Sequence, residues 1–290
     1  MKLTQEQLTK LCETAKEAAR EAGQYIQSQF DQEYETKGKL GGDSLASQVV
    51  TEVDFNAQEI ILNHLKTSIQ TYDLGLLTEE SVDDNSRLQK DYFWCIDPMD
   101  GTLPFTERRT GYAVSIALIA QEGYPVIGVV DVPDLDKCYS SVKGTGVYLN
   151  EESMKPVESK NQSTLHWYMD RSFQSEPYYE KLVEQMQQYP ETKDVIIHAE
   201  FGGVRNAIGV LTSGNGCYFK FPKKRNGCGS IWDYAATRLF AEELGYIVSN
   251  ARGEELHLND PNSTFMNAQG IIYATNPQLA DFLKELNNHR

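Results

Sequence analysis

The nine residues from Trp94 to Thr102 restrict what this chain can fold into more than any other stretch. They read Trp-Cys-Ile-Asp-Pro-Met-Asp-Gly-Thr, so a short apolar strand runs directly into two aspartates three positions apart. Because ligands of α/β proteins usually bind at strand ends, we expect Asp97 and Asp100 at one edge of a sheet. Carboxylate oxygens are the ligands that Mg²⁺ and Mn²⁺ prefer. The stretch therefore predicts a cation site, although Asp-Pro and Asp-Gly are also ordinary turn dipeptides.

Three acidic motifs lie far from this stretch in the sequence. Asp54 ends Thr-Glu-Val-Asp, Glu79 belongs to Leu-Thr-Glu-Glu-Ser, and Asp233 belongs to Ser-Ile-Trp-Asp-Tyr-Ala-Ala. Each also has a structural interpretation: Asp54 as a helix N-cap, Glu79 in a solvated loop, and Asp233 in a capping box with Ser230. A carboxylate in the first turn of a helix can still face a site, so the two interpretations of Asp233 are compatible.

Hydrophobic periodicity predicts a mixed α and β chain. Apolar residues at i+3 and i+4 steps, with Thr4 and Gln7 in capping-box relation, predict a helix over 4–30, and a second helix begins near Asp54. Residues 31–50 are polar and contain several glycines, which predicts a mobile loop or a ragged hairpin. The later segments predict strands at 93–96, 113–120, 125–132, 138–142, 165–169, 195–199, 246–249 and 271–274, and helices at 178–188, from 203, at 231–244 and from 277. This order predicts layered sheets and helices in two tightly joined halves, 1–155 and 156–290.

Composition excludes several classes of function. The chain has 290 residues, of which 40% are hydrophobic and 24% charged, as in ordinary globular proteins. Its net charge of −15 repels nucleic-acid polymers and anionic membranes, whereas a small phosphorylated ligand can bind where cations invert the local sign. We expect a cytoplasmic protein, since the N-terminus lacks a secretory signal and no apolar run approaches the roughly 20 residues of a membrane span. The five scattered cysteines and five histidines show no metal-ligand spacing, which favours reduced thiols and structural imidazoles.

Taken in order, the motifs T-x-x-D, E-E-S, W-x-x-D-P-x-D-G-T and W-D-x-A-A resemble those of the inositol monophosphatase superfamily. Segments at 144–147, 245–248 and 270–276 also fall where that family has similar ones, so the resemblance covers nearly the whole chain. It implies an α+β fold of the sugar-phosphatase type, a layered αβαβα sandwich of mixed sheets and helices with the active site between the two halves. It further implies a lithium-sensitive, metal-dependent phosphomonoesterase that forms a homodimer and binds two or three Mg²⁺ ions per site, with Mn²⁺ as an alternative.

The resemblance also implies roles for individual residues. The metal ligands would be Glu79, Asp97 and the Met99 carbonyl for the first ion, and Asp97, Asp100 and Asp233 for the second. Gly101 and Thr102 would hold phosphate oxygens through backbone N–H groups. Thr102 and Asp54 would orient and deprotonate the attacking water, while Glu79 holds a further, weaker metal. Because packed carboxylates repel each other, we expect some of them to stay protonated until divalent cations bind.

Two departures from the family pattern bear on the substrate. The loop at 103–109 reads Leu-Pro-Phe-Thr-Glu-Arg-Arg and continues in a way similar to the 3′(2′),5′-bisphosphate nucleotidase branch, and Asn226 stands where inositol monophosphatases commonly have an acid. Basic residues before Asp233 could pair with a second phosphate, or could belong to a solvated loop: Lys220, Lys223, Lys224 and Arg225. The leading substrate class is a bisphosphate nucleotide such as 3′-phosphoadenosine 5′-phosphate, with the last three of these residues as contacts. An inositol phosphate or another sugar or polyol phosphate is the alternative.

Two interpretations come from other classes of protein. A non-catalytic scaffold of the same fold is disfavoured because every candidate ligand is present. A haloacid-dehalogenase-type phosphatase would need Asp-x-Asp for its aspartyl nucleophile, whereas Asp97 and Asp100 are three apart. The phosphate-loop, nucleophile-elbow and dinucleotide-binding motifs are missing from the sequence. The sequence therefore predicts a metal-dependent phosphoric monoester hydrolase that acts on a small phosphorylated metabolite.

Overall fold

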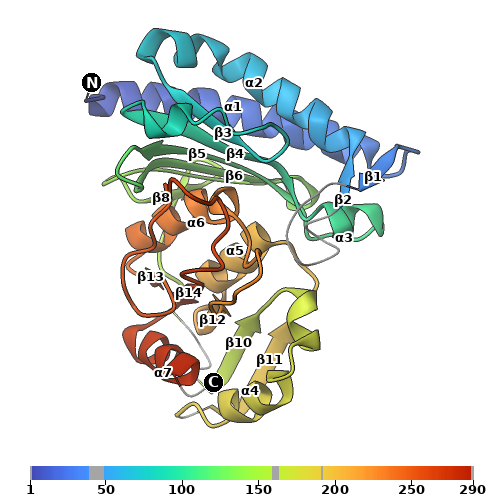
Figure 1. Cartoon of the computed structure of the whole chain (residues 1–290), viewed down its shortest axis with the longest axis vertical. Coiled ribbons are helices and arrows are strands. Elements are labelled where there is room, and N and C mark those ends of the chain that lie inside the picture. Colours follow the sequence, from blue (N-terminus) through green and yellow to red (C-terminus); the bar gives the residue numbers. More distant parts are fainter. Residues whose placement is uncertain (1, 39–48, 159–162, 191, 289–290) are drawn as a thin grey trace.

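The computed structural model describes residues 2–38, 49–158, 163–190 and 192–288. Within these ranges the chain forms five layers in the order helices, sheet, helices, sheet, helices (Figure 1). The helices of the three layers are α1 (Gln5–Gln29) with α2 (Glu52–Tyr72), α5 (Gly203–Ser213) with α6 (Ile231–Glu243), and α4 (Tyr179–Met186) with α7 (Pro277–Asn288). This arrangement confirms the predicted α+β fold and its αβαβα layers.

The first sheet has seven strands among the described residues, in the order β3-β4-β5-β6-β7-β8-β9. The strands are β3 (Gly75–Thr78), β4 (Tyr92–Asp100), β5 (Ala113–Ala120), β6 (Pro125–Val132), β7 (Lys137–Val142), β8 (Val147–Leu149) and β9 (Glu152–Met154). β5 and β6 are buried along their whole length because helices cover both faces of the sheet. This two-sided burial accounts for their nearly uninterrupted apolar sequences.

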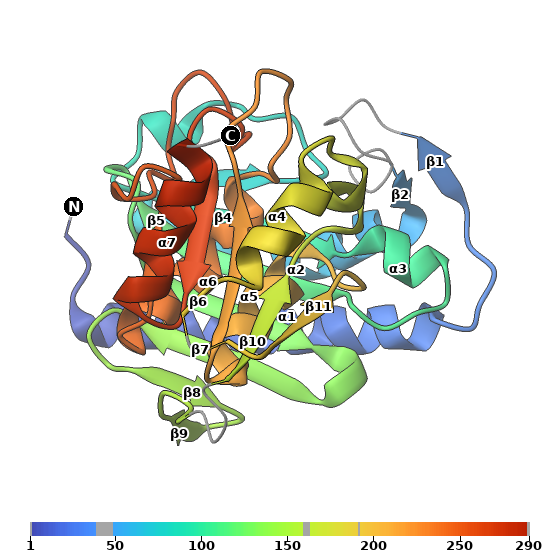
Figure 2. The same ribbon diagram turned by 90° about the horizontal axis from the view of Figure 1, so that it is seen from below.

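The second sheet has five strands in the described part of the chain, in the order β11-β10-β12-β14-β13. The strands are β10 (Thr164–Tyr168), β11 (Asp194–His198), β12 (Gly216–Lys220), β13 (Ile247–Ser249) and β14 (Ile271–Ala274). β10 runs parallel to β11 and β12, whereas β14 is antiparallel to β12 and β13. Figure 2 shows α4 and α7 in front of this sheet when the molecule is seen from below. Their buried leucines, such as Leu182 and Leu283, close the core beneath it.

Helix α1 packs on the first sheet through a stripe of small residues. Thr4 and Gln7 form the predicted capping box, with the side chain of each accepting from the backbone N–H of the other. Ala15, Ala18 and Ala22 are fully buried on the sheet-facing side. At Gly23 the contact is so close that a Cβ atom would lie 2.1 Å from a carboxylate oxygen of Asp131 on β6. The approach of helix and sheet therefore depends on side-chain size along this stripe.

The structure corrects several segment predictions. Helix α2 begins at Glu52 with Thr51 as its N-cap, so Asp54 is the N3 residue of a capping box and not the N-cap. The strand expected at 93–96 continues to Asp100, because Asp97 and Asp100 are both paired with β5, on either side of a register shift. One expectation needs no correction: the antiparallel pair of β1 (Thr36–Gly38) and β2 (Val49–Thr51) agrees with the ragged hairpin that was one alternative for the polar segment 31–50, of which residues 39–48 lie outside the described residues.

Other predictions have a mixed outcome. The strands expected at 113–120, 125–132 and 271–274 have the predicted bounds. The division of the chain at residue 155 stays a prediction. The five cysteines all lie in the described ranges and are buried as thiols that are not joined in disulfides, as expected. None of the helices in the described ranges combines the length and the apolar character needed to cross a membrane.

Candidate metal centre

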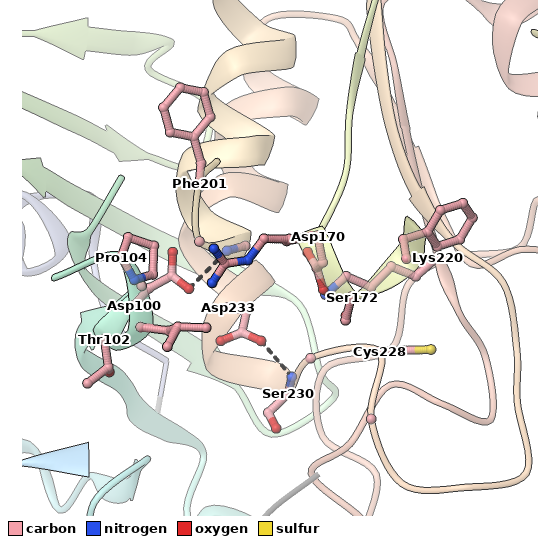
Figure 3. Close-up of a pocket in the computed structure, with 18 of the residues that line it drawn as sticks. Asp100, Thr102, Pro104, Asp170, Ser172, Phe201, Lys220, Cys228, Ser230 and Asp233 are labelled. Atoms are coloured by element: carbon pink, nitrogen blue, oxygen red, sulfur yellow. Dashed lines mark hydrogen bonds and ion pairs between the residues drawn. The ribbon is translucent and has the colours of Figure 1, made fainter. Parts of the chain in front are cut away.

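A cavity of about 340 Å³ lies where the end of β4 faces the first turns of α5 and α6 (Figure 3). Its volume falls within the roughly 300–1,000 Å³ that is usual for small-molecule sites. Residues between 79 and 109 line one part of it and residues between 170 and 265 line the rest. The cavity thus draws on both predicted halves of the chain, as the resemblance implied.

Three buried or half-buried carboxylates meet at this cavity. Asp97 and Asp100 come from β4 and Asp233 comes from α6, and one oxygen of each lies within 4.8 Å of the others. Residues three apart point to opposite faces of a regular strand. The register of β4 against β5 shifts between Asp97 and Asp100, and such an irregularity re-aims a side chain. This shift lets both aspartates of the motif contribute to one cluster.

Backbone N–H groups hold two of these carboxylates in place. Asp100 accepts hydrogen bonds of 2.9 and 2.8 Å from the N–H groups of Gly203 and Val204 at the start of α5. Asp233 accepts a 2.8 Å hydrogen bond from the N–H of Ser230 and completes the predicted capping box of α6. The structural interpretation of Asp233 is therefore confirmed, and it coexists with its place in the acidic cluster.

Burial and mutual repulsion disfavour negative charge on the cluster. Burial, followed by the charges of Glu79 and Asp100, raises the pKa of Asp97 well above its usual range. Burial and the charge of Asp233 raise the pKa of Asp100 in the same way. The pKa of Asp233 is raised to about 6, chiefly by burial and then by Glu79. These upward shifts point in the direction of the expectation that carboxylates of the cluster hold protons until a cation binds.

Glu79 and the Met99 carbonyl lie beside the cluster. Glu79 directly follows β3, and its N–H donates a 3.1 Å hydrogen bond to the carbonyl of Ile96 on β4. Both Glu79 and Met99 line the cavity, although the tight set of three carboxylates does not include Glu79. Every candidate ligand atom in this group is an oxygen, and oxygen ligands are the ones that hard divalent cations bind. The described residues therefore fit Mg²⁺ or a similar ion.

A second pair, Asp54 and Thr102, connects α2 to the start of α3 (Thr102–Thr106). The Thr102 hydroxyl donates a 2.9 Å hydrogen bond to Oδ1 of Asp54 and lies 3.2 Å from the carbonyl oxygen of Met99. The other oxygen of Asp54 accepts the N–H and the hydroxyl of Thr51. Burial raises the pKa of Asp54 to about 6, against the opposing effect of these hydrogen bonds. Asp54 can therefore exchange a proton near neutral pH.

Gly101 allows the chain to turn between the cluster and this pair. Its φ of 87° lies in the left-handed region, and a Cβ atom there would come within 2.6 Å of the carbonyl oxygen of Gly111. Gly101 and Thr102 both line the cavity, where their backbones are within reach of a ligand.

The basic residues before Asp233 have different surroundings. Lys220 is buried and forms a 2.5 Å ion pair with Asp170. Lys223 lines the cavity, whereas Lys224 and Arg225 are not among the lining residues, and Arg225 pairs with Glu176 at 2.5 Å. The structure therefore brings Lys223 to the cavity and spreads the predicted substrate contacts over different environments.

The sequence analysis missed two groups of lining residues. Arg109 and Arg171 line the cavity and share Glu107, which lies 64 positions before Arg171. A set of aromatic side chains also forms part of the wall: Phe173, Tyr178, Phe201, Trp232 and Phe265. Arg109 ends the loop 103–109, which departs from the family pattern. No sequence motif near Arg109 indicates that it lies close to Arg171.

Comparison with known proteins agrees with this geometry. The sequence model of the inositol monophosphatase family matches residues 7–289. The chain belongs to the inositol monophosphatase family. Members of this family are metal-dependent phosphatases, and the chain has the cluster of acidic residues that such a site needs.

Individual relatives in this family differ in the substrate that their names carry. Inositol monophosphatase 2 of Solanum lycopersicum is 33% identical over 153 residues, which are 52% of this chain and 54% of that protein, so the chain matches about half of that relative's length. The fructose-1,6-bisphosphatase/inositol-1-monophosphatase of Thermotoga maritima is 25% identical over 225 residues, 78% of this chain and 79% of that one.

Solved structures share the fold. The structure of SaIMPase-II bound to 2′-AMP has a TM-score of 0.70 and 21% identity, and covers 97% of this chain and 99% of its own. The same protein has also been solved with inositol monophosphate bound, with a TM-score of 0.69 and 19% identity over 94% of this chain and 92% of its own. At these identities the likeness shows the fold alone.

Proposed function

We propose that this protein is a Mg²⁺-dependent phosphatase that hydrolyses a phosphate monoester of a small metabolite. The observation that carries the proposal is the cluster of Asp97, Asp100 and Asp233 in one cavity, with the hydrogen-bonded pair of Asp54 and Thr102 beside it. The cluster supplies cation ligands and the pair supplies a proton acceptor.

The acidic cluster suits divalent cations for an electrostatic reason. Asp97, Asp100 and Asp233, with Glu79 and the Met99 carbonyl, would hold the ions. Burial, and then repulsion between the carboxylates, raises the pKa values of the three aspartates, and bound cations would favour their charged forms. Ions bound there would polarise the phosphate ester and make water more acidic.

The residues beside the cluster would position phosphate and water. The backbone N–H groups of Gly101 and Thr102 would bind phosphate oxygens at the turn into α3. The Thr102 hydroxyl donates a hydrogen bond to Asp54, so its oxygen lone pairs are available to accept a hydrogen bond from the attacking water. As the water oxygen bonds to phosphorus and the ester bond between phosphorus and the alcohol oxygen breaks, a water proton would pass to the Thr102 oxygen while the Thr102 proton passes to Asp54. The leaving alkoxide would take up one proton, which restores the Asp54 carboxylate. No side-chain nucleophile is needed.

The cavity wall favours a nucleotide as the substrate. Half-buried aromatic side chains such as Phe201, Trp232 and Phe265 offer apolar surface to a base and its sugar. We therefore retain a 3′(2′),5′-bisphosphate nucleotide, for example 3′-phosphoadenosine 5′-phosphate, as the leading class. The relative that binds 2′-AMP supports a nucleotide, although it also binds inositol monophosphate.

An inositol or sugar phosphate is the second candidate. Asp170, Ser172 and Lys220 also line the cavity, and their polar groups could bind the hydroxyls of a polyol. Two relatives carry inositol monophosphatase in their names, which supports this alternative.

A phosphate-release assay tests the proposal. The purified chain would be incubated with 3′-phosphoadenosine 5′-phosphate, inositol monophosphates, fructose 1,6-bisphosphate and NADP, each with Mg²⁺ and with excess EDTA. We expect release that depends on Mg²⁺ and is fastest with the bisphosphate nucleotide. A faster reaction with an inositol phosphate would favour the alternative, and no release from any substrate would favour the scaffold interpretation.

Three expectations based on the family resemblance belong to this proposal. We infer that two copies of the chain form a homodimer, that Li⁺ inhibits the reaction, and that the protein acts in the cytoplasm. Light scattering on the protein eluted from a size-exclusion column measures the molar mass and so tests the homodimer. The rate of phosphate release with added LiCl tests the inhibition by Li⁺.

A further inference from the structure

A carboxylate joins two arginines that line the cavity and are distant from each other in the sequence. Glu107, just after α3, accepts hydrogen bonds of 3.0 and 2.8 Å from Nη1 and Nη2 of Arg171, in a bidentate arrangement. Arg109 donates a third, of 3.1 Å, to the same carboxylate. Both arginines line the cavity that holds the acidic cluster. Positive charge is therefore gathered in a cavity whose other part is strongly acidic.

We propose that Arg109 and Arg171 form a second anion subsite, which binds the phosphate group of a bisphosphate substrate that is not hydrolysed. The subsite would make the enzyme selective for bisphosphates over monophosphates. The inference rests on the proposed function, because it supposes that a first phosphate binds at the acidic cluster.

The two guanidinium groups have donors to spare for such a ligand. Each guanidinium carries five N–H donors. Within the described residues, Glu107 accepts two from Arg171 and one from Arg109, which leaves three and four, respectively. The formal charge of the trio is +2 − 1 = +1, so it attracts a phosphate dianion. Planar guanidinium groups also match the geometry of phosphate oxygens, which ammonium groups do not.

Several other charged groups of the wall lie close to an oppositely charged or titratable side chain, and Lys223 is a further cation among the lining residues. Lys220 is paired with the carboxylate of Asp170 at 2.5 Å in a buried position. Glu176 pairs with Arg225 at 2.5 Å, and Glu200 lies 3.6 Å from His198. By contrast, the side chains of Arg109 and Arg171 are 43% and 45% exposed, so an entering anion can reach them.

Glu107 would act as the competitor for this subsite. The hydrogen bonds and charges of Arg171, and then of Arg109, lower the pKa of Glu107, so its carboxylate stays charged at neutral pH. A phosphate dianion competes for the donors that Glu107 occupies more strongly than a neutral hydroxyl does, because hydrogen bonds between two charged groups are the stronger ones. Removing the charge of Glu107 should therefore strengthen binding of a second phosphate, while removing an arginine should weaken it.

Variants at these positions test the proposal through substrate selectivity. The quantity measured is the ratio of kcat/KM for adenosine 3′,5′-bisphosphate to kcat/KM for adenosine 3′-monophosphate, at saturating Mg²⁺. We expect Arg171→Gln and Arg109→Gln each to lower this ratio about tenfold, the effect of losing one charge-assisted contact, mainly through KM. Glu107→Gln should raise the ratio. Arg252→Gln, which removes an exposed arginine paired with Glu254 and not lining the cavity, should leave it unchanged.

The kcat/KM ratio should rise in Glu107→Gln and fall in the arginine variants. This opposition distinguishes an anion subsite from a purely structural ion pair, whose loss should affect the two substrates alike. If Glu107→Gln and Arg171→Gln change the kinetics of both substrates alike and leave the ratio unchanged, the proposal is wrong. If the wild-type protein hydrolyses neither nucleotide, the nucleotide form of the proposed function fails, whereas phosphatase activity toward other substrates is judged by the phosphate-release assay. The subsite is then judged by calorimetric titration of the same two nucleotides with Ca²⁺, which takes similar oxygen ligands. The subsite would be upheld if the wild-type protein binds the bisphosphate more tightly than the monophosphate and Arg171→Gln abolishes this difference. Equal affinity of the wild-type protein for the two nucleotides would refute it.

Discussion

The Thr102 hydroxyl donates a 2.9 Å hydrogen bond to Oδ1 of Asp54, a residue 48 positions earlier in the chain. The second oxygen of Asp54 accepts the N–H of Thr51 at 2.7 Å in the capping box of α2. One carboxylate thus fixes the first turn of a helix and orients a hydroxyl in the cavity. A group held on both oxygens has little freedom to move, which suits a residue that positions water.

Removal of the Thr102 hydroxyl should impair catalysis without unfolding the protein. We expect Thr102→Ala to lower kcat by about 100-fold or more, in the range for loss of a positioned proton-transfer group. Thr102→Ser keeps the hydroxyl and should retain most of the activity. Steady-state kinetics at saturating Mg²⁺, with circular dichroism to verify folding, provide the measurement. Near-normal turnover by the alanine variant would remove Thr102 from the mechanism.

Substitution of one carboxylate in the cluster should separate activity from stability. Asp100→Asn and Asp233→Asn each remove a negative charge from a group whose pKa is raised by burial and neighbouring acids. The relief of repulsion offsets the lost hydrogen bonding, so we expect folding to be retained. Activity should fall by about 100-fold or more, or about 2.7 kcal/mol, since the ions lose a ligand. Phosphate release and thermal unfolding would be compared with those of Asp84→Asn, an exposed carboxylate outside the cavity wall.

The effect of Mg²⁺ on stability should increase with pH. Asp54 and Asp233 have pKa values raised to about 6 in the folded state, against about 3.9 in an unfolded chain. Without metal, the contribution of each group to the free energy of unfolding is fully present below about pH 4. About 2–3 kcal/mol of it per group is lost as the pH rises from about 4 through about 6, because the folded state holds the proton more tightly than the unfolded chain does. Bound cations reverse this loss by stabilising the charged carboxylates.

The measurement is the difference in Tm between samples with Mg²⁺ and with EDTA, at several pH values between about 5 and about 8. Comparing the two samples at one pH cancels the titration of groups outside the site. A difference in Tm that stays constant across this range would contradict the proposed linkage.

A glycine in α1 should resist a change that ordinarily stabilises helices. Gly→Ala in a helix interior usually gains about 1 kcal/mol. At Gly23, however, the added Cβ would lie 2.1 Å from Oδ2 of Asp131, so we expect Gly23→Ala to lower the free energy of unfolding by about 1–3 kcal/mol. Combining it with Asp131→Ala, which removes the obstructing carboxylate, should recover part of this loss relative to Asp131→Ala alone. Urea unfolding of the single and double variants measures the free energies of unfolding. A Gly23→Ala variant more stable than the wild type would show that the Asp131 side chain moves aside at little cost.

Local sequence patterns predicted much of the fold. The alanine stripe and capping box of α1 follow from residues within a few positions of each other, and β5 and β6 have the bounds that their apolar runs predict. The position of Asp54 was misjudged because Thr and Asp are both favoured near helix starts, and only the hydrogen bonds show which one is the N-cap. The short strands β8 and β9 were not predicted, since strands of three residues carry too few side chains to show a pattern, whereas the antiparallel pair of β1 and β2 agrees with the ragged hairpin expected at 31–50.

The sequence by itself determined the chemistry that this protein can offer: oxygen ligands in four acidic motifs, helices and strands to carry them, and a resemblance that names the family. Only the tertiary structure decided which groups meet. The shifted register of β4 turns Asp97 and Asp100 toward one cluster, and the packing of distant segments brings Glu107 to Arg171. The physical reason is that helix caps and hydrophobic periodicity act between near neighbours in the chain. Contacts between distant residues depend instead on how whole layers pack, and no local pattern records that.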